Sequence, residues 1–240
     1  MQKTALVRCL RQNLQSVERS CHKGETTLDI LAGLKDKLRF IERHYAAASD
    51  SFRETKRKIE DGEAPFEPPP FDPDSATDFD PPFLERWQEA DESLNIEGQA
   101  ALKLLHNAFH DYLKWFVDLS AVKLTASGKN WLERYRKHFR DAYGIDFEQG
   151  PVPLDELEEV NLARNDTEHS SDPFGMTRRQ SGEHQLRFPT GLFVDETDKQ
   201  IAQSSRDTWP GRINVTDEGL REAIRRVETF CEWLDSQRPY

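Results

Sequence analysis

The longest regular pattern in the chain is a series of apolar residues that recur every three or four positions. The series consists of Leu31, Leu34, Leu38, Ile41, Tyr45, Ala48, Phe52 and Ile59, with Thr55 as a polar exception. This spacing, kept over about four heptads, is typical of a helix whose apolar seam packs against another helix, as in a coiled coil. The pattern therefore predicts one long helix, paired either with the segment before it or with another chain.

Signals for the ends of this helix lie on both sides of the pattern. Thr26 or Thr27 is a candidate N-cap, because a hydroxyl there can accept a hydrogen bond from the first turn, and Gly62 marks the expected stop. A shorter amphipathic stretch precedes it at residues 4–20. Residues 1–64 are therefore predicted to form an N-terminal helical hairpin or coiled coil that can dimerise or dock a partner protein.

An acidic, proline-rich segment follows at residues 65–82. Seven of the 13 prolines fall within it. Proline lacks the amide hydrogen that a helix needs, so this composition favours an extended linker. Residues 65–100 contain ten acidic residues and one basic residue, so the segment could instead act as an acidic strap that covers a basic surface or recruits a partner.

Four helical patterns follow the linker, within residues 83–240. They cover residues 83–120, with an interruption expected near Asn95–Gly98; residues 130–143, which end at Gly144; residues 154–169; and residues 213–236, with Thr216 as a start signal. A long loop is expected at 170–213. Residues 184–196 inside it alternate enough to predict a small hairpin around the Pro-Thr-Gly at 189–191. The predicted fold class is all-α, a four-helix domain preceded by the N-terminal hairpin.

The overall composition limits the environment and the partners of the chain. Its 240 residues, 36% of them hydrophobic, can enclose a core, and no apolar run reaches the roughly 18 residues of a membrane span. The start lacks the apolar segment of a signal peptide, and Cys9, Cys21 and Cys231 lack metal-type spacing, so they are interpreted as reduced thiols in a cytoplasmic protein. The net charge of -11 argues against nonspecific duplex binding but leaves room for a local basic site.

The clearest candidate for chemistry is the hexapeptide RNDTEH at residues 164–169. One side of its predicted helix carries a series that ends on a charge: Leu154, Leu157, Val160, Asn161 and Arg164. The R-x4-H spacing alone is a weak signal, because Arg39–His44 and Arg179–His184 share it. RNDTEH differs in its context, with Asn directly after the Arg, an acidic helix before it and an expected helix end after it.

In that context the sequence resembles the HEPN superfamily. Ribonucleases of this family carry an Arg-polar-x3-His motif near the end of the third helix of a four-helix bundle, and Arg164, Asn165 and His169 match it. The resemblance covers about residues 83–240. It implies an HEPN-like bundle that acts as a homodimeric, metal-independent endoribonuclease without a cofactor, in a toxin or antiphage role. An antitoxin or defence partner could bind the N-terminal coiled coil.

The resemblance also implies a role for each motif residue. Arg164 and His169 lie about 140° apart around a helix, so they do not easily converge, whereas Asn165 and His169 share a face. A two-fold dimer would set the Arg of one subunit and the His of the other across one phosphate. The RNA 2′-OH would be the nucleophile, His169 the general acid or base, Arg164 the phosphate clamp, and Asn165 an orienting group.

A structural interpretation of the same residues is the alternative. Arg164 and Glu168 have the i,i+4 spacing of an ordinary helix ion pair, and His169 could cap the helix end. The protein would then be a catalytically silent helical adaptor. One departure from the family also matters, because Ser171 replaces the Tyr that nucleotidyltransferase-controlled toxins carry two residues after the His.

Basic residues outside the motif are candidate RNA contacts. They are Lys129, Arg134, Arg136 and Lys137, together with Arg178, Arg179 and Arg187 in the long loop. Trp131 and Tyr135 lie within the first group and suit base stacking, although a solvated helix face explains the same pattern. His106 and His110 have the i,i+4 spacing of zinc ligands but lack an evident third ligand, so a place in the core is favoured.

Overall fold

The computed structural model describes residues 29–68, 81–120, 122–124, 126–128, 130–169, 184, 187–196, 198–200 and 213–238. Its regular elements are α2 (Ile30–Asp61), α3 (Leu84–Asp118), α4 (Trp131–Tyr143), the 3-10 helix η2 (Phe147–Gln149), α5 (Leu154–His169) and α8 (Asp217–Ser236). The described residues contain no strand, and the all-α fold class is confirmed. None of these helices has the length and apolar character to cross a membrane.

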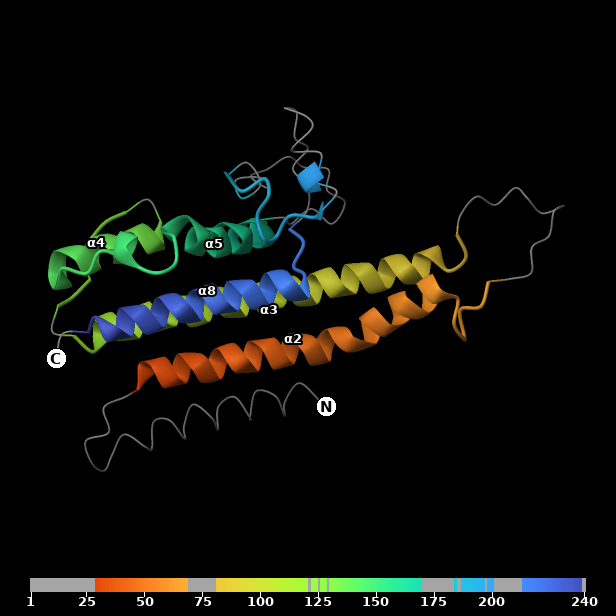
Figure 1. Cartoon of the computed structure of the whole chain (residues 1–240), viewed down its shortest axis with the longest axis horizontal. Helices are drawn as coiled ribbons and strands as arrows, with labels where there is room; N and C mark the ends of the chain where they lie inside the picture. The colour runs from red at the N-terminus through yellow and green to blue at the C-terminus, as the bar shows by residue number, and fades with distance from the viewer. Residues whose placement is uncertain are drawn as a thin grey trace, which may run out of the picture.

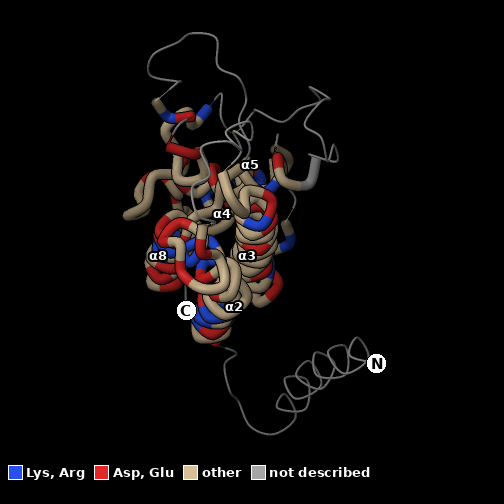
Figure 2. The backbone as a smooth tube through the Cα atoms, turned by 90° about the vertical axis from the view of Figure 1, so that its right-hand side faces the viewer, with Lys and Arg blue, Asp and Glu red and all other residues tan. Residues whose placement is uncertain are grey.

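The helices form three layers (Figure 1). Helices α3 and α8 lie side by side in the middle, α2 runs along one side of this pair, and α4 and α5 follow one another along the other side. The end-on view in Figure 2 shows α2 and α5 on opposite sides of the α3–α8 pair. Helix α5, which carries RNDTEH, therefore packs against both middle helices.

The ends of α2 follow from local capping, with one correction. The Asp29 carboxylate accepts a hydrogen bond from Ala32 N at 2.8 Å, and Gly62 ends the helix in the left-handed conformation. The predicted stop at Gly62 is confirmed. The predicted cap at Thr26 or Thr27 is wrong, because an aspartate side chain satisfies the first turn as well as a hydroxyl does, and Asp29 stands closer to the apolar seam.

The apolar seam of α2 finds its partner within the chain. Its buried residues are Ile30, Leu34, Leu38, Ile41, Tyr45 and Ser49. All except the serine belong to the buried cluster formed with α3 and α8, so the predicted pairing with the preceding segment or with another chain is wrong for this face. Ion pairs set the antiparallel register with α3, from Lys37 to Asp111 at 3.0 Å and from Lys56 to Asp91 at 2.7 Å. The predicted linker at 65–82 thus joins two helices of one core, and residues 4–20 lie outside the described residues.

Helix α3 runs without a break through the position where an interruption was predicted. Gly98 is a contact point there, because an added Cβ would lie 2.7 Å from Val215 Cβ and 2.9 Å from its carbonyl oxygen. Tyr45 of α2 donates its hydroxyl to the same carbonyl at 3.0 Å. The glycine therefore allows the chain before α8 to approach α3 closely, and the prediction of a break near Asn95–Gly98 is wrong.

The predicted ends of α4 and the start of α8 are confirmed. Asn130 Oδ1 accepts a hydrogen bond from Glu133 N at 2.8 Å, and Gly144 closes α4 in the left-handed conformation. Thr216 Oγ1 accepts from Gly219 N at 3.0 Å and caps α8. The expected apolar side of α8 is fully buried: Val227, Phe230, Cys231 and Leu234.

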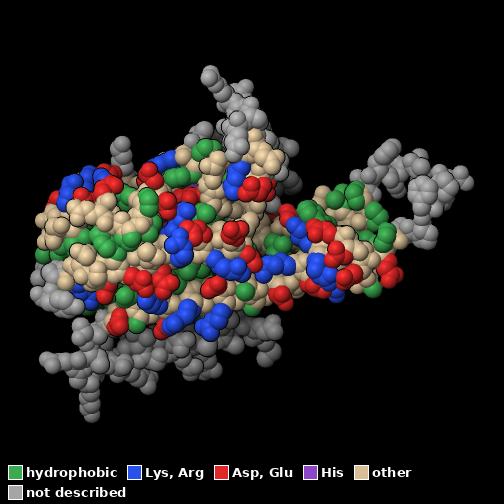
Figure 3. All heavy atoms as spheres, viewed as in Figure 1, with side chains coloured by type: hydrophobic (Ala, Val, Ile, Leu, Met, Phe, Trp, Pro, Cys, Tyr) green, Lys and Arg blue, Asp and Glu red, His purple; other side chains and the backbone are tan. Residues whose placement is uncertain are grey.

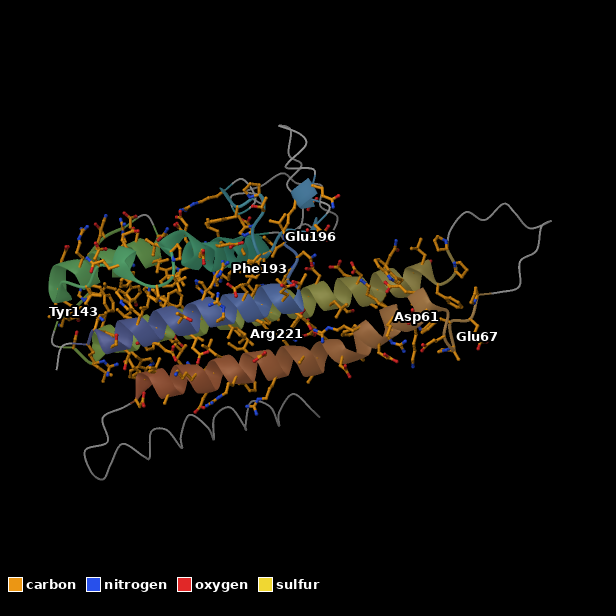
Figure 4. The ribbon with its side chains drawn as sticks, in the orientation of Figure 1. Asp61, Glu67, Tyr143, Phe193, Glu196 and Arg221 are labelled. Carbon is orange, nitrogen blue, oxygen red and sulfur yellow. The ribbon has the colours of Figure 1, made fainter. Side chains whose placement is uncertain are left out.

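The predicted hairpin at 184–196 is wrong, since the described residues of this segment form helical turns and irregular turns without a strand. Phe193 and Val194 are both buried, although consecutive residues of a strand point to opposite faces. Phe193 lies below the end of α5, close to the start of α8 (Figure 4). Glu159 of α5 accepts a hydrogen bond from Leu192 N at 2.5 Å. This side chain therefore bonds a backbone N–H that in a hairpin would bond the partner strand.

Two glycine substitutions test the close approach at Gly98. Gly98→Ala should lower the free energy of unfolding by about 1–3 kcal/mol, because the added methyl group overlaps Val215. Gly33→Ala in α2 is the matched control, since no atom apart from its chain neighbours and the nearby backbone of its own helix lies within 4 Å of its added Cβ. Alanine there should raise the free energy of unfolding by up to about 1 kcal/mol through helix propensity. Urea denaturation measures both, and equal effects of the two changes would contradict the packing role of Gly98.

Candidate functional site

The RNDTEH segment is helical throughout, because α5 ends at His169. Arg164 and Asn165 are partly exposed, and the Arg164 guanidinium donates to Asn165 Oδ1 at 3.2 Å. Asp166 and Thr167 are buried instead, and Thr167 donates its hydroxyl to the Arg164 carbonyl at 2.7 Å. Two of the three predicted catalytic residues therefore lie together at the surface. The side chains of Glu168 and His169 lie outside the described residues.

Arg164 borders a buried network that joins α3, α4 and α5. The Asn161 side-chain oxygen accepts a hydrogen bond from Trp131 Nε1 at 2.7 Å and lies 3.2 Å from His106 Nε2. An indole N–H only donates, so the Asn161 atom that it bonds is the acceptor oxygen. His106 Nε2 must therefore carry a hydrogen to bond the same oxygen. His106 Nδ1 lies 3.3 Å from Asn107 Oδ1. The tautomer of His106 is thus set by Asn161.

His106 is held uncharged by its surroundings. Burial lowers its pKa, and the positive charge of Arg164 acts in the same direction, whereas the side-chain oxygens of Asn107 and Asn161 raise it, because acceptors at both ring nitrogens favour the protonated ring. Arg164 lies three residues beyond Asn161 on α5, and Asn161 contacts this imidazole. Residues three apart on a helix share a face, so Arg164 lies on the same side of α5 as Asn161.

His110 continues the row of rings one turn further along α3. The His106 and His110 rings are parallel with centroids 6.4 Å apart, and Trp131 meets them edge-on at 5.2 Å and 5.1 Å. Burial lowers the pKa of His110 as well. The described residues offer no group of three or more His, Cys, Asp or Glu that could hold a metal ion, so the two histidines gain no third ligand among them.

A buried ionic cluster lies on another side of α5. His184 is fully buried, with its Nε2 3.3 Å from Glu159 Oε1, and its backbone N–H donates to Asp166 Oδ2 at 3.2 Å. Arg226 of α8 lies 3.5 Å from Glu159 Oε2 and 3.1 Å from Glu156. His184, which belongs to one of the chance R-x4-H matches, therefore anchors the long loop to α5.

Three of the predicted RNA-contact residues are paired with carboxylates. Arg136 pairs with Glu148 at 2.9 Å, and Lys137 pairs with Glu133 at 3.1 Å. Arg187 pairs with Asp155 at 2.8 Å and with Glu158 at 2.7 Å. Arg136 and Arg187 both line a cavity of about 680 Å³ between α4, η2 and α5, but these carboxylates line it too.

Arg134 is the exposed member of the basic run on α4, and its Nε donates to the Ala126 carbonyl at 3.4 Å. Tyr135 is buried, so its ring is not a surface for base stacking. Lys129, Arg178 and Arg179 lie outside the described residues.

Sequence reasoning missed the roles of Asn161, Glu159 and His184. In the sequence, Asn161 was noted only as a member of the apolar side of its helix. A polar side chain on that side was the signal that could have indicated a buried hydrogen-bond network. Glu159 and His184 are 25 residues apart, and His184 and Asp166 are 18 apart, so local spacing does not reveal these contacts.

Comparison of the chain with protein-family models, curated proteins and solved structures finds no match. The site itself is therefore the basis for the proposed function. It places a guanidinium, a carboxamide and two uncharged imidazoles at the junction of three helices.

The pH dependence of stability tests the buried state of His106. A lowered pKa in the folded protein means that the unfolded chain takes up a proton first as the pH falls below about 6.5. The free energy of unfolding should therefore decrease between pH 7 and pH 5. His106→Gln keeps an amide donor toward Asn161 but does not titrate, so it should reduce this decrease by up to about 1.4 kcal/mol per pH unit. Urea denaturation at several pH values measures this, and identical slopes for the two proteins would refute it.

Proposed function

We propose that the protein is a metal-independent endoribonuclease of the HEPN type, in which Arg164, Asn165 and His169 act on one phosphate. The observation that carries the proposal is the geometry of α5, which stays helical to His169 and exposes Arg164 and Asn165 while it buries Asp166 and Thr167. The order of α3, α4, α5 and α8, with the motif at the end of α5, also agrees with the bundle that the resemblance implies. The toxin or antiphage role belongs to the same proposal.

The surroundings of Arg164 suit a phosphate. Its guanidinium contacts a neutral carboxamide, and the nearby His106 is uncharged at neutral pH. A planar guanidinium can bind two phosphate oxygens and stabilise the charge that grows on them in the transition state. Arg164 is therefore assigned as the phosphate clamp, and Asn165 orients it through the 3.2 Å hydrogen bond.

The spacing of the motif calls for two subunits. In a helix, Arg164 and His169 are separated by about 7.5 Å along the axis and about 140° around it. A single copy therefore presents its two groups in different directions. In a two-fold dimer, the Arg164 of one copy and the His169 of the other can meet across the axis.

The reaction follows from the substrate's own nucleophile. The 2′-oxygen attacks the adjacent phosphorus, its proton passes to a base, and the bond from phosphorus to the 5′-oxygen breaks. His169 takes the proton from the 2′-hydroxyl and returns one to the departing 5′-oxygen, since an imidazole exists in both forms near neutral pH. The products are a 2′,3′-cyclic phosphate and a 5′-hydroxyl.

The proposal is tested by comparing wild type with His169→Ala, in cells and in vitro. Wild type should impair growth and degrade RNA, and the variant should lose at least about a hundredfold of the cleavage rate while remaining folded. Cleavage should persist in EDTA, and a 2′-deoxy substitution at the scissile position should block it. Equal cleavage by both proteins, or a strict need for an added metal ion, would refute the mechanism. No toxicity and no cleavage from either folded protein would favour the catalytically silent adaptor.

The shared site has its own test in mixed dimers of Arg164→Ala and His169→Ala. Each variant alone should be nearly inactive. If the groups come from different subunits, the heterodimer has one cleft without either group and one intact cleft, so coexpression should restore part of the wild-type activity. Native mass spectrometry confirms that mixed dimers form. Their complete inactivity would show that each cleft uses both groups of one chain.

A further inference from the structure

Exposed apolar side chains gather on one part of the molecule. The large apolar side chains that the described residues expose are Phe40 of α2, Ile96, Leu104 and Trp115 of α3, and Phe83, Leu119 and Val122 close to the ends of α3. None of them belongs to the described residues of α4, α5 or α8. Phe40 is 55% exposed and Trp115 is 48% exposed, which is high for aromatic residues. Apolar side chains that gather on one surface, instead of being scattered singly, are typical of a binding surface.

The ion pair between Lys37 and Asp111, at 3.0 Å, identifies the edge of the α2–α3 pair on which several of them lie. Phe40 lies three positions after Lys37, and Trp115 lies four positions after Asp111. Residues at such spacings share a face of a helix, so both rings lie on the side of this ion pair. We call this edge the outer α2–α3 face. It consists of Gly33, Phe40 and His44 of α2 and Leu104 and Trp115 of α3, arranged around the ion pair.

Helix α8 covers the opposite edge of the same pair. Lys35, about 200° around α2 from Lys37, pairs with Glu232 of α8 at 2.5 Å. Glu42 pairs with Arg221 of α8 at 3.5 Å. Figure 3 shows this covered side, where basic and acidic side chains are interspersed over α8 and α2. In the end-on view of Figure 2, α8 stands on one side of α3, and no helix of the described chain stands next to the outer α2–α3 face.

The shape of the outer α2–α3 face suits a helix. The Phe40 and His44 rings are parallel, with centroids 5.6 Å apart, and form a flat aromatic surface. Gly33 lies two turns before Phe40 on the same side of α2. An added Cβ there would meet no atom within 4 Å apart from its chain neighbours and the nearby backbone of its own helix. The backbone of another helix can therefore come close to α2 at Gly33 while its side chains pack against the rings.

The sequence before α2 contains an apolar stripe that needs such a partner. The amphipathic stretch at residues 4–20 carries Leu6, Leu10, Leu14 and Val17. Steps of four, four and three residues place these side chains on one face of a helix. A helix of this kind is stable only when its apolar face packs against another element.

The length of this part of the chain matches the outer α2–α3 face. The structure describes the chain from Asp29, next to the end of the face that holds Gly33. The eight residues 21–28 are enough to turn the chain between two antiparallel helices. A helix over residues 4–20 is about 26 Å long, and the distance along α2 from Gly33 to His44 is about 17 Å. A helix that returns along α2 therefore spans the whole face.

We propose that residues 4–20 form a helix that packs antiparallel to α2 on the outer α2–α3 face, with its apolar stripe on Phe40, Leu104 and Trp115. This face differs from the apolar seam of α2, which is buried against α3 and α8. A tether of eight residues gives the segment an effective concentration on the order of 1 mM at the face. A second copy of the chain, or another protein at micromolar concentration, competes poorly at equal affinity. The chain's own segment is therefore the occupant.

This inference is independent of the proposed nuclease. It needs neither Arg164 nor His169, because α2 and α5 lie on opposite sides of the α3–α8 pair (Figure 2). Loss of the packed segment and loss of RNA cleavage are therefore separate outcomes.

Hydrogen–deuterium exchange of the full chain, followed by mass spectrometry, tests the segment. In wild type, the amides of residues 4–20 should exchange at least about tenfold more slowly than in a free peptide of the same sequence. Leu10→Asp puts a charge on the apolar stripe and should remove this protection. Gln12→Asp is the matched control, because position 12 lies about 200° around the helix from position 10. It should change the exchange rates less than about twofold.

The same measurement on variants of the outer α2–α3 face tests the contact surface. Phe40→Asp and Trp115→Asp should each raise the exchange rates of residues 4–20 by about tenfold. Ala46→Asp is the matched control, since Ala46 is also exposed on α2 but lies about 120° around the helix from Phe40. It should leave these rates within about twofold of wild type. Unchanged exchange of the α8 amides confirms that the core is intact in every variant.

Two results would overturn the proposal directly. One is the absence of protection in residues 4–20 of wild type, and the other is an equal effect of Phe40→Asp and Ala46→Asp. Native mass spectrometry then identifies the copy that supplies the segment. Wild type and Phe40→Asp should have the same oligomeric state if the segment packs within its own chain. A wild-type dimer that becomes a monomer in Phe40→Asp would show that a second copy fills the face instead.

Discussion

The carboxamide of Asn161 is the contact on which the position of the candidate site depends. Its oxygen accepts from Trp131 of α4 and from His106 of α3, so one side chain of α5 ties three helices together. Removing a buried acceptor of this kind leaves its donors unsatisfied, at about 1–3 kcal/mol each. Arg164 lies three residues further along α5, on the same side of the helix as Asn161.

A second set of polar contacts holds α5 from another side. The buried Glu159 carboxylate meets Leu192 N, His184 and Arg226, and so joins α5 to the long loop and to α8. A buried carboxylate without such partners would be strongly unfavourable, so these contacts and those of Asn161 together fix the rotation of α5. That rotation decides which residues of RNDTEH face outward. The partly exposed pair is Arg164 and Asn165, and the buried pair is Asp166 and Thr167.

The sequence by itself determined the all-α class, most of the helix ends and the helical setting of RNDTEH. These features depend on short-range signals: the cap at Asn130, the left-handed glycines at 62 and 144, and the cap at Thr216. Only the tertiary structure decided the partner of the α2 seam, the role of Gly98 as a contact point and the turns in place of a hairpin. It also decided that Arg136 and Arg187 are paired and that His106 contacts Asn161. Each of these depends on residues far apart in the chain, as in the hydrogen bond between His106 and Asn161 across 55 positions. Spacing and propensity describe one segment at a time, whereas such contacts exist only once the segments pack together.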